Sequence, residues 1–253
     1  MKQTNNLIDQ AARYKPIIDY INENHPEKIL EIGSWSQWIW RFININFDWL
    51  DLSKNDYQKN ERETWSNMNF IYWNALDIPV KNNTYDLVFS CDMLEHIHRK
   101  DREKVLNEAL RVCKKWCIVI FWFPCWFFGK MSDYFLFYSF KILHLINQKI
   151  TIPTRLTEHI DIDYPSNKEV QLLLKRISKE YQLNTKKIKK YNFNNVFFHI
   201  IFIFLDMSIY MTRLFYSSWA RKIHNYFMNK YLNTKLCYIK SIFPYRKYII
   251  IKK

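Results

Sequence analysis

One stretch of the chain, residues 84–115, limits the possible folds more than any other. It begins with a short apolar run, Leu87-Val88-Phe89, which is bounded by polar residues as buried strands usually are. A polar loop follows, and then an amphipathic helix that places these residues on one face: Val105, Leu106, Ala109, Leu110 and Cys113. Strand, loop and helix in this order form half of a βαβ unit. Ligands bind at the carboxyl ends of such strands, so we expect residues 90–96 to lie at a functional site.

Six other segments have the composition of strands in the same sheet. They cover residues 28–32, 48–52, 69–73, 116–123, 183–191 and 248–251. The segment 116–123 is almost wholly apolar, as expected for a strand that is buried on both faces. The order of strands and helices predicts an α/β fold: a doubly wound, mostly parallel, seven-stranded sheet. We expect a single domain over residues 1–253, with aromatic helical insertions at about 125–150 and 195–244.

Two strings within the first stretch resemble a known family. DLVFSCDMLEHI, followed by LNEALRVCKK, is similar to the fourth-strand segment of class I S-adenosylmethionine-dependent methyltransferases. Members of the small-molecule and glycan branch often read DxVxxxxxLEHI and then xExxRVLKxxG. The resemblance implies a Rossmann-like fold whose last strand is antiparallel. It also implies transfer of a methyl group from S-adenosylmethionine.

The first strand ends in a partial match to the glycine motif of that family, E-x-G-x-G-x-G. Glu31 and Gly33 match, whereas Trp35 and Gln37 occupy the second and third glycine positions. The resemblance places Glu31 and Gly33 at the methionine end of the cofactor. The missing glycines would otherwise let the backbone approach the ligand. Their loss favours an alternative, a catalytically inactive subunit that binds a membrane or a partner.

The second and third strands end in residues suited to the nucleoside part of the cofactor. Asp51 lies 18 residues after Gly33, close to the ~20 at which an acid contacts ribose hydroxyls in such folds. An exposed acid at a strand end is the alternative. The resemblance places Asn74 and Ala75 at the adenine, where the side-chain carbonyl of Asn74 can accept a hydrogen bond. Asp77 is a second candidate for that role.

The loop after the fourth strand supplies the remaining candidates. The resemblance places this set beneath the transferred methyl group: Ser90, Cys91, Asp92 and Leu94. An oxygen acceptor would need a general base, for which His96 and His159 are the candidates. For His159, a structural role in its loop is the more common alternative. We expect no metal site. The five cysteines show no paired spacing, which favours reduced thiols in a cytoplasmic protein.

Positive charge is concentrated in the carboxyl half. Residues 1–120 contain 16 Lys and Arg against 17 Asp and Glu, a net of −1, whereas residues 121–253 contain 22 against 7, a net of +15. Basic residues mixed with aromatic ones suit a membrane surface or nucleic acid. A solvated basic face is the alternative.

The segment Val196–Tyr216 is the most hydrophobic helix candidate. Its polar residues His199, Asp206 and Arg213 are seven apart and so lie on one narrow stripe. We expect an interfacial helix, with a substrate lid or a core helix as the next alternative. A membrane span comes last, because a central Asp costs roughly 2.5–3.5 kcal/mol on insertion. We therefore predict that residues 195–244 bind anionic membranes at the cytoplasmic face and that the acceptor is a small molecule, glycan or lipid-linked precursor. An RNA substrate is less favoured, since the charge coincides with apolar helices.

Overall fold

The structure is a computed structural model, and it describes a large part of the chain. The described residues are 8–33, 39, 43, 45–52, 68–122, 128–148, 150–152, 165–183, 185–195, 226 and 244–253. Several residues considered above lie outside them: Trp35, Gln37, His159 and nearly all of the 195–244 segment. The predictions made for those residues remain predictions.

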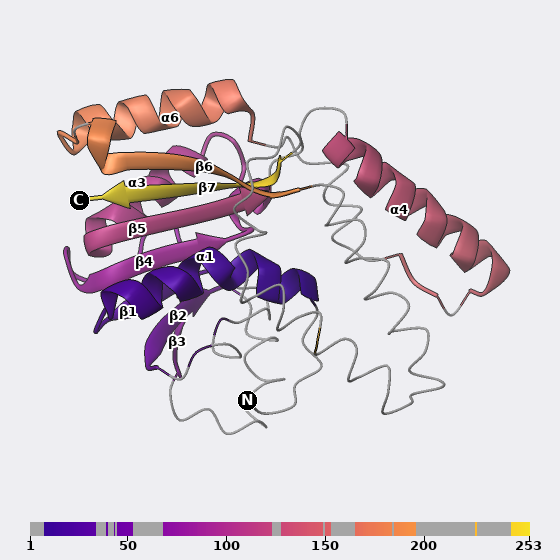
Figure 1. The fold of residues 1–253 in the computed structure, drawn as a ribbon, viewed down its shortest axis with the longest axis horizontal. Coiled ribbons are helices and arrows are strands. Elements are labelled where there is room, and N and C mark those ends of the chain that lie inside the picture. Colours follow the sequence, from indigo (N-terminus) through magenta and orange to yellow (C-terminus); the bar gives the residue numbers. More distant parts are fainter. Residues whose placement is uncertain are drawn as a thin grey trace.

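A seven-stranded sheet forms the centre of the molecule (Figure 1). Its strands are β1 (Ile29–Ile32), β2 (Phe47–Asp51), β3 (Met68–Tyr72), β4 (Tyr85–Cys91), β5 (Cys113–Trp122), β6 (Ile188–Asn195) and β7 (Pro244–Lys252). They lie in the order β3-β2-β1-β4-β5-β7-β6. The first five are parallel, and β7 is antiparallel to both of its neighbours. The predicted doubly wound, mostly parallel sheet is therefore confirmed, including its antiparallel last strand.

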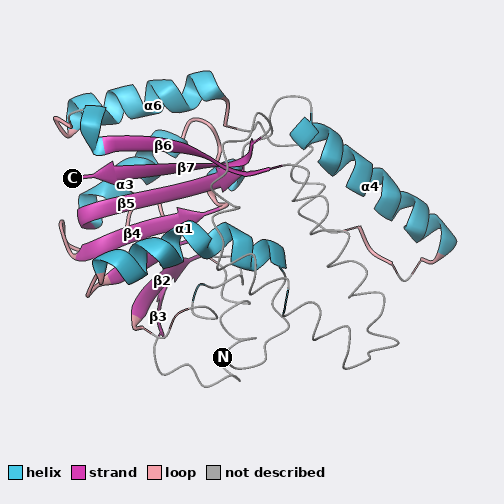
Figure 2. Ribbon diagram, viewed as in Figure 1, coloured by secondary structure: helices cyan, strands magenta, loops and turns pink. Residues whose placement is uncertain are grey.

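Helices cover both faces of the sheet (Figure 2). Helix α1 (Ile8–Asn24) packs on one face, and α3 (Arg102–Val112) and α6 (Asn167–Glu180) pack on the other. The short helix η2 (Leu94–His96) lies in the loop after β4. Helix α4 (Phe128–Ile146) lies beyond the carboxyl edge of the sheet, within the first predicted insertion (Figure 1).

Successive side chains of the central strands point to opposite faces of the sheet, so the hydrophobic core consists of two clusters, one on each face. Leu87 and Phe89 of β4 point to the α1 side, where they pack with Ile17. Val88, which lies between them, packs on the α3 and α6 side with Leu110. All seven residues of β4 are buried, as expected for the centre of a sheet that is covered on both faces.

Helix α1 runs without interruption through Pro16. One element boundary differs from the expected one. Strand β6 begins at Ile188 and not at residue 183, because Leu183 is buried in the core and a turn of 3₁₀ helix, η3 (Thr185–Lys187), comes before the strand. The side chain of Leu183 thus packs under the sheet before the chain turns into it.

Arg102 joins three elements in the interior. Its fully buried guanidinium donates through Nε to the carbonyl oxygens of Leu94 (3.1 Å) and Ile97 (3.0 Å), at the two ends of η2. Through Nη1 it pairs with Glu169 Oε1 at 2.7 Å. Glu169 belongs to α6, whose first turn is capped by Ser166. The side chain of Arg102 therefore holds the loop after β4 against both α3 and α6.

We predict that Arg102→Leu lowers the free energy of unfolding by about 3–5 kcal/mol, because it leaves the buried Glu169 carboxylate without its closest cation. Chemical denaturation measures the loss. The control is Arg176→Leu, which removes an ion pair with Glu103 in which the Arg176 side chain is 65% exposed. That variant should cost under about 1 kcal/mol. Equal losses for the two variants would contradict the role given to Arg102.

Candidate functional site

The strand order reverses between β1 and β4, and the candidate residues gather at the carboxyl edge there. Ile32 of β1 is in register with Leu50 of β2, and the Gly33 amide donates to the Leu50 carbonyl at 2.9 Å. The Trp73 amide donates to the Asp51 carbonyl at 3.2 Å, which places the loop after β3 beside the end of β2. Ligands of doubly wound sheets bind at this kind of reversal.

Glu31 is a buried acid on the α1 face of the sheet. Its Oε1 accepts a hydrogen bond of 2.7 Å from the Tyr14 hydroxyl. Its Oε2 has no hydrogen-bond partner among the described residues. Burial raises the pKa of Glu31 to about 8. The hydrogen bond from Tyr14 acts in the opposite direction and lowers the pKa, whereas the nearby charge of Asp51 raises it further. A cation that arrived at Oε2 would favour the ionised carboxylate.

Gly33 occupies a position that only glycine suits. Its φ is +67°, in the left-handed region. A Cβ placed there would lie 2.5 Å from the Sδ of Met93 and 2.7 Å from its Cγ. The end of β1 and the loop after β4 therefore meet at van der Waals contact at the carboxyl edge of the sheet.

Helix α1 supplies a second link to the same loop. Arg13 is buried and pairs through Nη1 with Asp92 Oδ2 at 3.1 Å. Asp92 has a φ of +51°, and the thiol of Cys91 donates to the Arg13 carbonyl at 3.8 Å. The ion pair thus holds a carboxylate at the turn that follows β4.

Arg13 and Tyr14 were not among the residues predicted from the sequence. The available signal was the helical spacing of Tyr14, Ile17 and Ile21, which places the tyrosine on the buried stripe. A buried tyrosine needs a hydrogen-bond partner. Its partner, Glu31, lies on another element, and the sequence does not identify it.

The loop after β4 holds the other predicted residues together. Ser90 is buried, and its hydroxyl has no hydrogen-bond partner among the described residues. Leu94 is buried at the start of η2. His96 is half-buried at the end of η2, and its amide donates to the Met93 carbonyl at 2.9 Å. His159, the other candidate base, lies outside the described residues.

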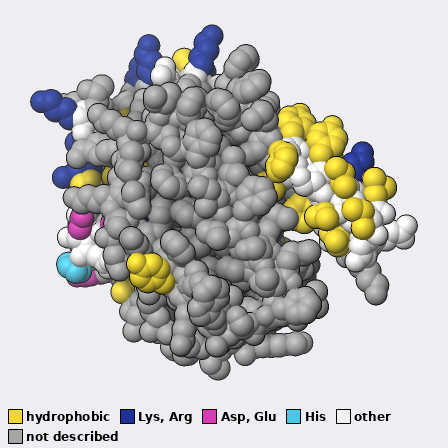
Figure 3. Space-filling model, turned by 45° about the vertical axis from the view of Figure 1, so that its right-hand side comes forward, with side chains coloured by type: hydrophobic (Ala, Val, Ile, Leu, Met, Phe, Trp, Pro, Cys, Tyr) yellow, Lys and Arg dark blue, Asp and Glu magenta, His cyan; other side chains and the backbone are white. Residues whose placement is uncertain are grey.

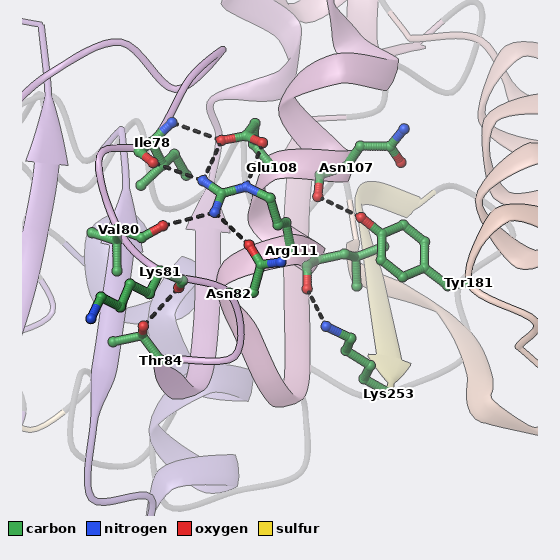
Figure 4. Close-up of polar contacts among 11 residues, drawn as sticks. Ile78, Val80, Lys81, Asn82, Thr84, Asn107, Glu108, Arg111, Tyr181 and Lys253 are labelled. Carbon is green, nitrogen blue, oxygen red and sulfur yellow. Dashed lines mark hydrogen bonds and ion pairs between the residues drawn. The ribbon is translucent and has the colours of Figure 1, made fainter.

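Arg111 of α3 forms hydrogen bonds with the loop after β3 (Figure 4). Arg111 donates to the carbonyl oxygens of Ile78 and Val80, each at 2.7 Å, and pairs with Glu108 at 2.7 Å. Glu108 in turn accepts from the Ile78 amide at 2.7 Å. Hydrogen bonds from Arg111 lower the pKa of Glu108, assisted by the Ile78 amide and opposed by burial.

The contacts of Glu108 and Arg111 give a structural role to part of LNEALRVCKK, the second string that resembles the methyltransferase family. Glu108 and Arg111 are its ExxR positions, and they fix the chain just after the two candidate adenine-binding residues. Ala75 is buried, while Asn74 is exposed. The Oδ1 of Asn74 accepts a hydrogen bond from the Leu76 amide at 2.9 Å. One lone pair of that oxygen is therefore already used in a hydrogen bond within the turn.

Thiol and metal chemistry can be assessed only for the described part of the chain. There, Cys91, Cys113 and Cys117 are free and buried. Within the same part, no three His, Cys, Asp or Glu side chains are grouped so as to hold a metal ion.

We predict that Gly33→Ala destabilises the fold by roughly 1–3 kcal/mol, because the new Cβ meets Met93 and the left-handed backbone conformation is strained. Thermal or chemical denaturation measures the loss. The control is Gly129→Ala, at the other glycine of the chain and within α4, where alanine favours the helix. An unchanged stability in Gly33→Ala would show that the two segments do not meet as described.

We also predict a pH dependence that comes from Glu31. Because its pKa in the folded protein is raised from 4.5 to about 8, the folded state holds a proton that the unfolded state loses in this interval. Stability should therefore fall as the pH rises from about 5 to about 8, by at most about 1.4 kcal/mol per pH unit. Glu31→Gln should remove this part of the slope, whereas Glu23→Gln, at an exposed position of α1, should retain it. Equal slopes in the two variants, measured by denaturation across the pH range, would contradict the assignment.

Residues 32–116 match a family model described as a methyltransferase domain. The plantazolicin methyltransferase BpumL, solved with a substrate analogue and S-adenosylhomocysteine, aligns at 12% identity over 97% of this chain and 83% of its own, with a TM-score of 0.56. An S-adenosylmethionine-dependent methyltransferase from Archaeoglobus fulgidus aligns at 14% identity over 96% and 92%, with a TM-score of 0.53. A putative sarcosine dimethylglycine methyltransferase from Galdieria sulphuraria aligns at 15% identity over 94% and 85%, with a TM-score of 0.52.

Two other matches are partial. The alignment covers 44% of the [4+2]-cyclase SpnF and 57% of the Pyrococcus horikoshii protein PH0226, about half of each. The likeness to the three structures with TM-scores above 0.5, at identities of 12–15%, shows a shared fold alone. The family model contains β4, its loop and α3, which are the elements that carry the resembling strings. By this match and by its fold, the chain is similar to the class I S-adenosylmethionine-dependent methyltransferases.

Proposed function

We propose that the protein transfers a methyl group from S-adenosylmethionine to a small-molecule, glycan or lipid-linked acceptor. The observation that carries this proposal is the meeting of Glu31, Gly33, Asp51 and Asp92 at one edge of the sheet, where the strand order reverses. The plantazolicin methyltransferase BpumL, solved with a triazolic analogue, supports a small-molecule acceptor.

The site has features that fit the cofactor. The Oε2 of Glu31 and the hydroxyl of Ser90 are buried without hydrogen-bond partners among the described residues, and buried polar atoms of this kind ordinarily have partners. The methionine end of the cofactor carries an ammonium group, which can donate to Glu31. Ser90, Cys91 and Leu94 would line the site with Asp92. Asn74 and Ala75 would contact the adenine, with Asp51 at the ribose.

The chemistry requires little from the protein beyond position. When bound, the cofactor supplies an activated methyl group on its sulfonium. This chain would hold the acceptor in line with that group and exclude water, and such positioning can supply several kcal/mol of the barrier reduction. For an oxygen acceptor, His96 would accept the proton from its position at the end of η2. His159 is proposed as the alternative base.

We further propose that the protein acts at the cytoplasmic face of a membrane. The net charge of +15 on residues 121–253 supports attraction to anionic lipids. No helix of the described residues is both long and apolar enough to cross a bilayer.

We predict that the protein binds S-adenosylhomocysteine despite Trp35 and Gln37, and that Asp51→Ala weakens this binding roughly tenfold or more, since the ribose hydroxyls lose a charged acceptor. Calorimetric titration measures both affinities. The matched control is Asp48→Asn, also on β2. Its carboxylate accepts from Tyr85 on the opposite face of the sheet at 2.6 Å, so the affinity should not change.

Two outcomes would count against these assignments. If the folded wild-type protein fails to bind at millimolar ligand, the methyl-transfer proposal is wrong. If Asp51→Ala binds as tightly as the wild type, the ribose does not lie at Asp51.

A further inference from the structure

Helix α4 exposes an apolar stripe to solvent. Its large exposed side chains are Tyr134, Phe135, Tyr138, Ile142, Leu145 and Ile146. At 3.6 residues per turn, these positions fall within an arc of about 120°. Figure 3 shows them as a concentration of hydrophobic side chains on the projecting part of the molecule. A contiguous apolar surface of this kind marks an interaction site more often than it marks ordinary protein surface.

The helix is held in a way that keeps the stripe outward. Leu136, on the opposite side, is buried. At the carboxyl end, His144 donates through Nδ1 to the Ile150 carbonyl at 2.6 Å, and the Asn147 amide donates to the Leu143 carbonyl at 2.8 Å. These bonds close the last turn and leave Leu145 and Ile146, which are 76% and 78% exposed, projecting into solvent.

The chain around the stripe carries an excess of positive charge. Helix α4 contains Lys130 and Lys141 against one acid, Asp133, and the sequence from Ile142 to Thr157 adds Lys149 and Arg155 with no acidic residue. Lys141 is exposed and, by its helical position, borders the stripe. Pairing with a second copy would bring two basic surfaces together, whereas an anionic lipid surface would attract them.

The composition of the stripe also suits a bilayer interface. Tyrosine and phenylalanine combine an apolar body with affinity for the headgroup region, and leucine and isoleucine add insertion energy. The stripe covers only part of the helix circumference. The remainder combines the polar residues Ser139, Lys141 and His144 with buried or half-buried apolar residues, Leu136, Phe137, Phe140 and Leu143. A helix of this kind lies in the membrane plane.

We propose that the exposed face of α4 docks the protein on anionic membranes by inserting this stripe among the lipids. This inference does not depend on the methyl-transfer reaction. It adds a second contact to the one expected of residues 195–244. Because α4 lies beyond the carboxyl edge of the sheet (Figure 1), the docked protein would hold the candidate site on its membrane side.

Co-sedimentation of the full-length protein with phosphatidylcholine vesicles, with and without phosphatidylglycerol, tests the proposal. We expect binding to the anionic vesicles, and we expect the double variant Leu145→Ser/Ile146→Ser to bind them roughly tenfold or more weakly. Lys141→Glu should weaken binding by roughly tenfold, and only when anionic lipid is present. Leu172→Ser, at a 47% exposed leucine on α6, is the matched control and should bind as the wild type does.

Several results would overturn the proposal. These are wild-type protein that ignores anionic vesicles, a folded double variant that still binds at full strength, or a concentration-dependent dimer that the double variant abolishes. If the double variant fails to fold, Lys141→Glu decides alone, and unchanged binding by it contradicts the proposal. Binding of S-adenosylhomocysteine should persist in every folded variant, which separates this test from that of the methyl-transfer proposal.

Discussion

The structure depends on burying both faces of a parallel sheet. Side chains of β1 and β4 alternate between the α1 side and the α3 and α6 side, and almost every one of them is buried. Parallel strands can be joined only by crossovers, and the crossovers here place helices on both faces. The order of strands then reverses between β1 and β4. A crevice at the carboxyl edge is the geometric consequence, and the candidate site lies there.

Buried ionic contacts hold the loops that border this crevice. Arg102 ties the ends of η2 to Glu169, and Arg111 ties the loop after β3 to Glu108. Both arginines project from α3, so one helix fixes two loops that the strands alone would leave unsupported. Arginine suits this task because its planar guanidinium donates in several directions at once. The position of both loops therefore depends on the packing of α3 against the sheet.

Helix α1 has a direct part in the site. Tyr14 donates to Glu31, and Arg13 pairs with Asp92, so the helix contacts the ends of β1 and β4 together. Both contacts involve buried or half-buried acids, which are costly in the interior unless they are paired or protonated. A ligand cation near Glu31 would change that balance.

The sequence by itself determined the number of strands, their order along the chain and the amphipathic face of α3. These follow from local periodicity and from short apolar runs, which are properties of neighbouring residues. The antiparallel last strand was implied by the family resemblance. The sequence also singled out Gly33, by its motif, and Asp51, by its spacing, as candidate cofactor-binding residues, and that role remains a prediction. The tertiary structure alone decided that Gly33 meets Met93, that Arg13 reaches Asp92, and that Glu108 and Arg111 anchor the loop after β3. It also decided that α4 exposes its apolar stripe. Such contacts join residues far apart in the chain, and no local pattern encodes which distant partner a buried charge or an apolar face will meet.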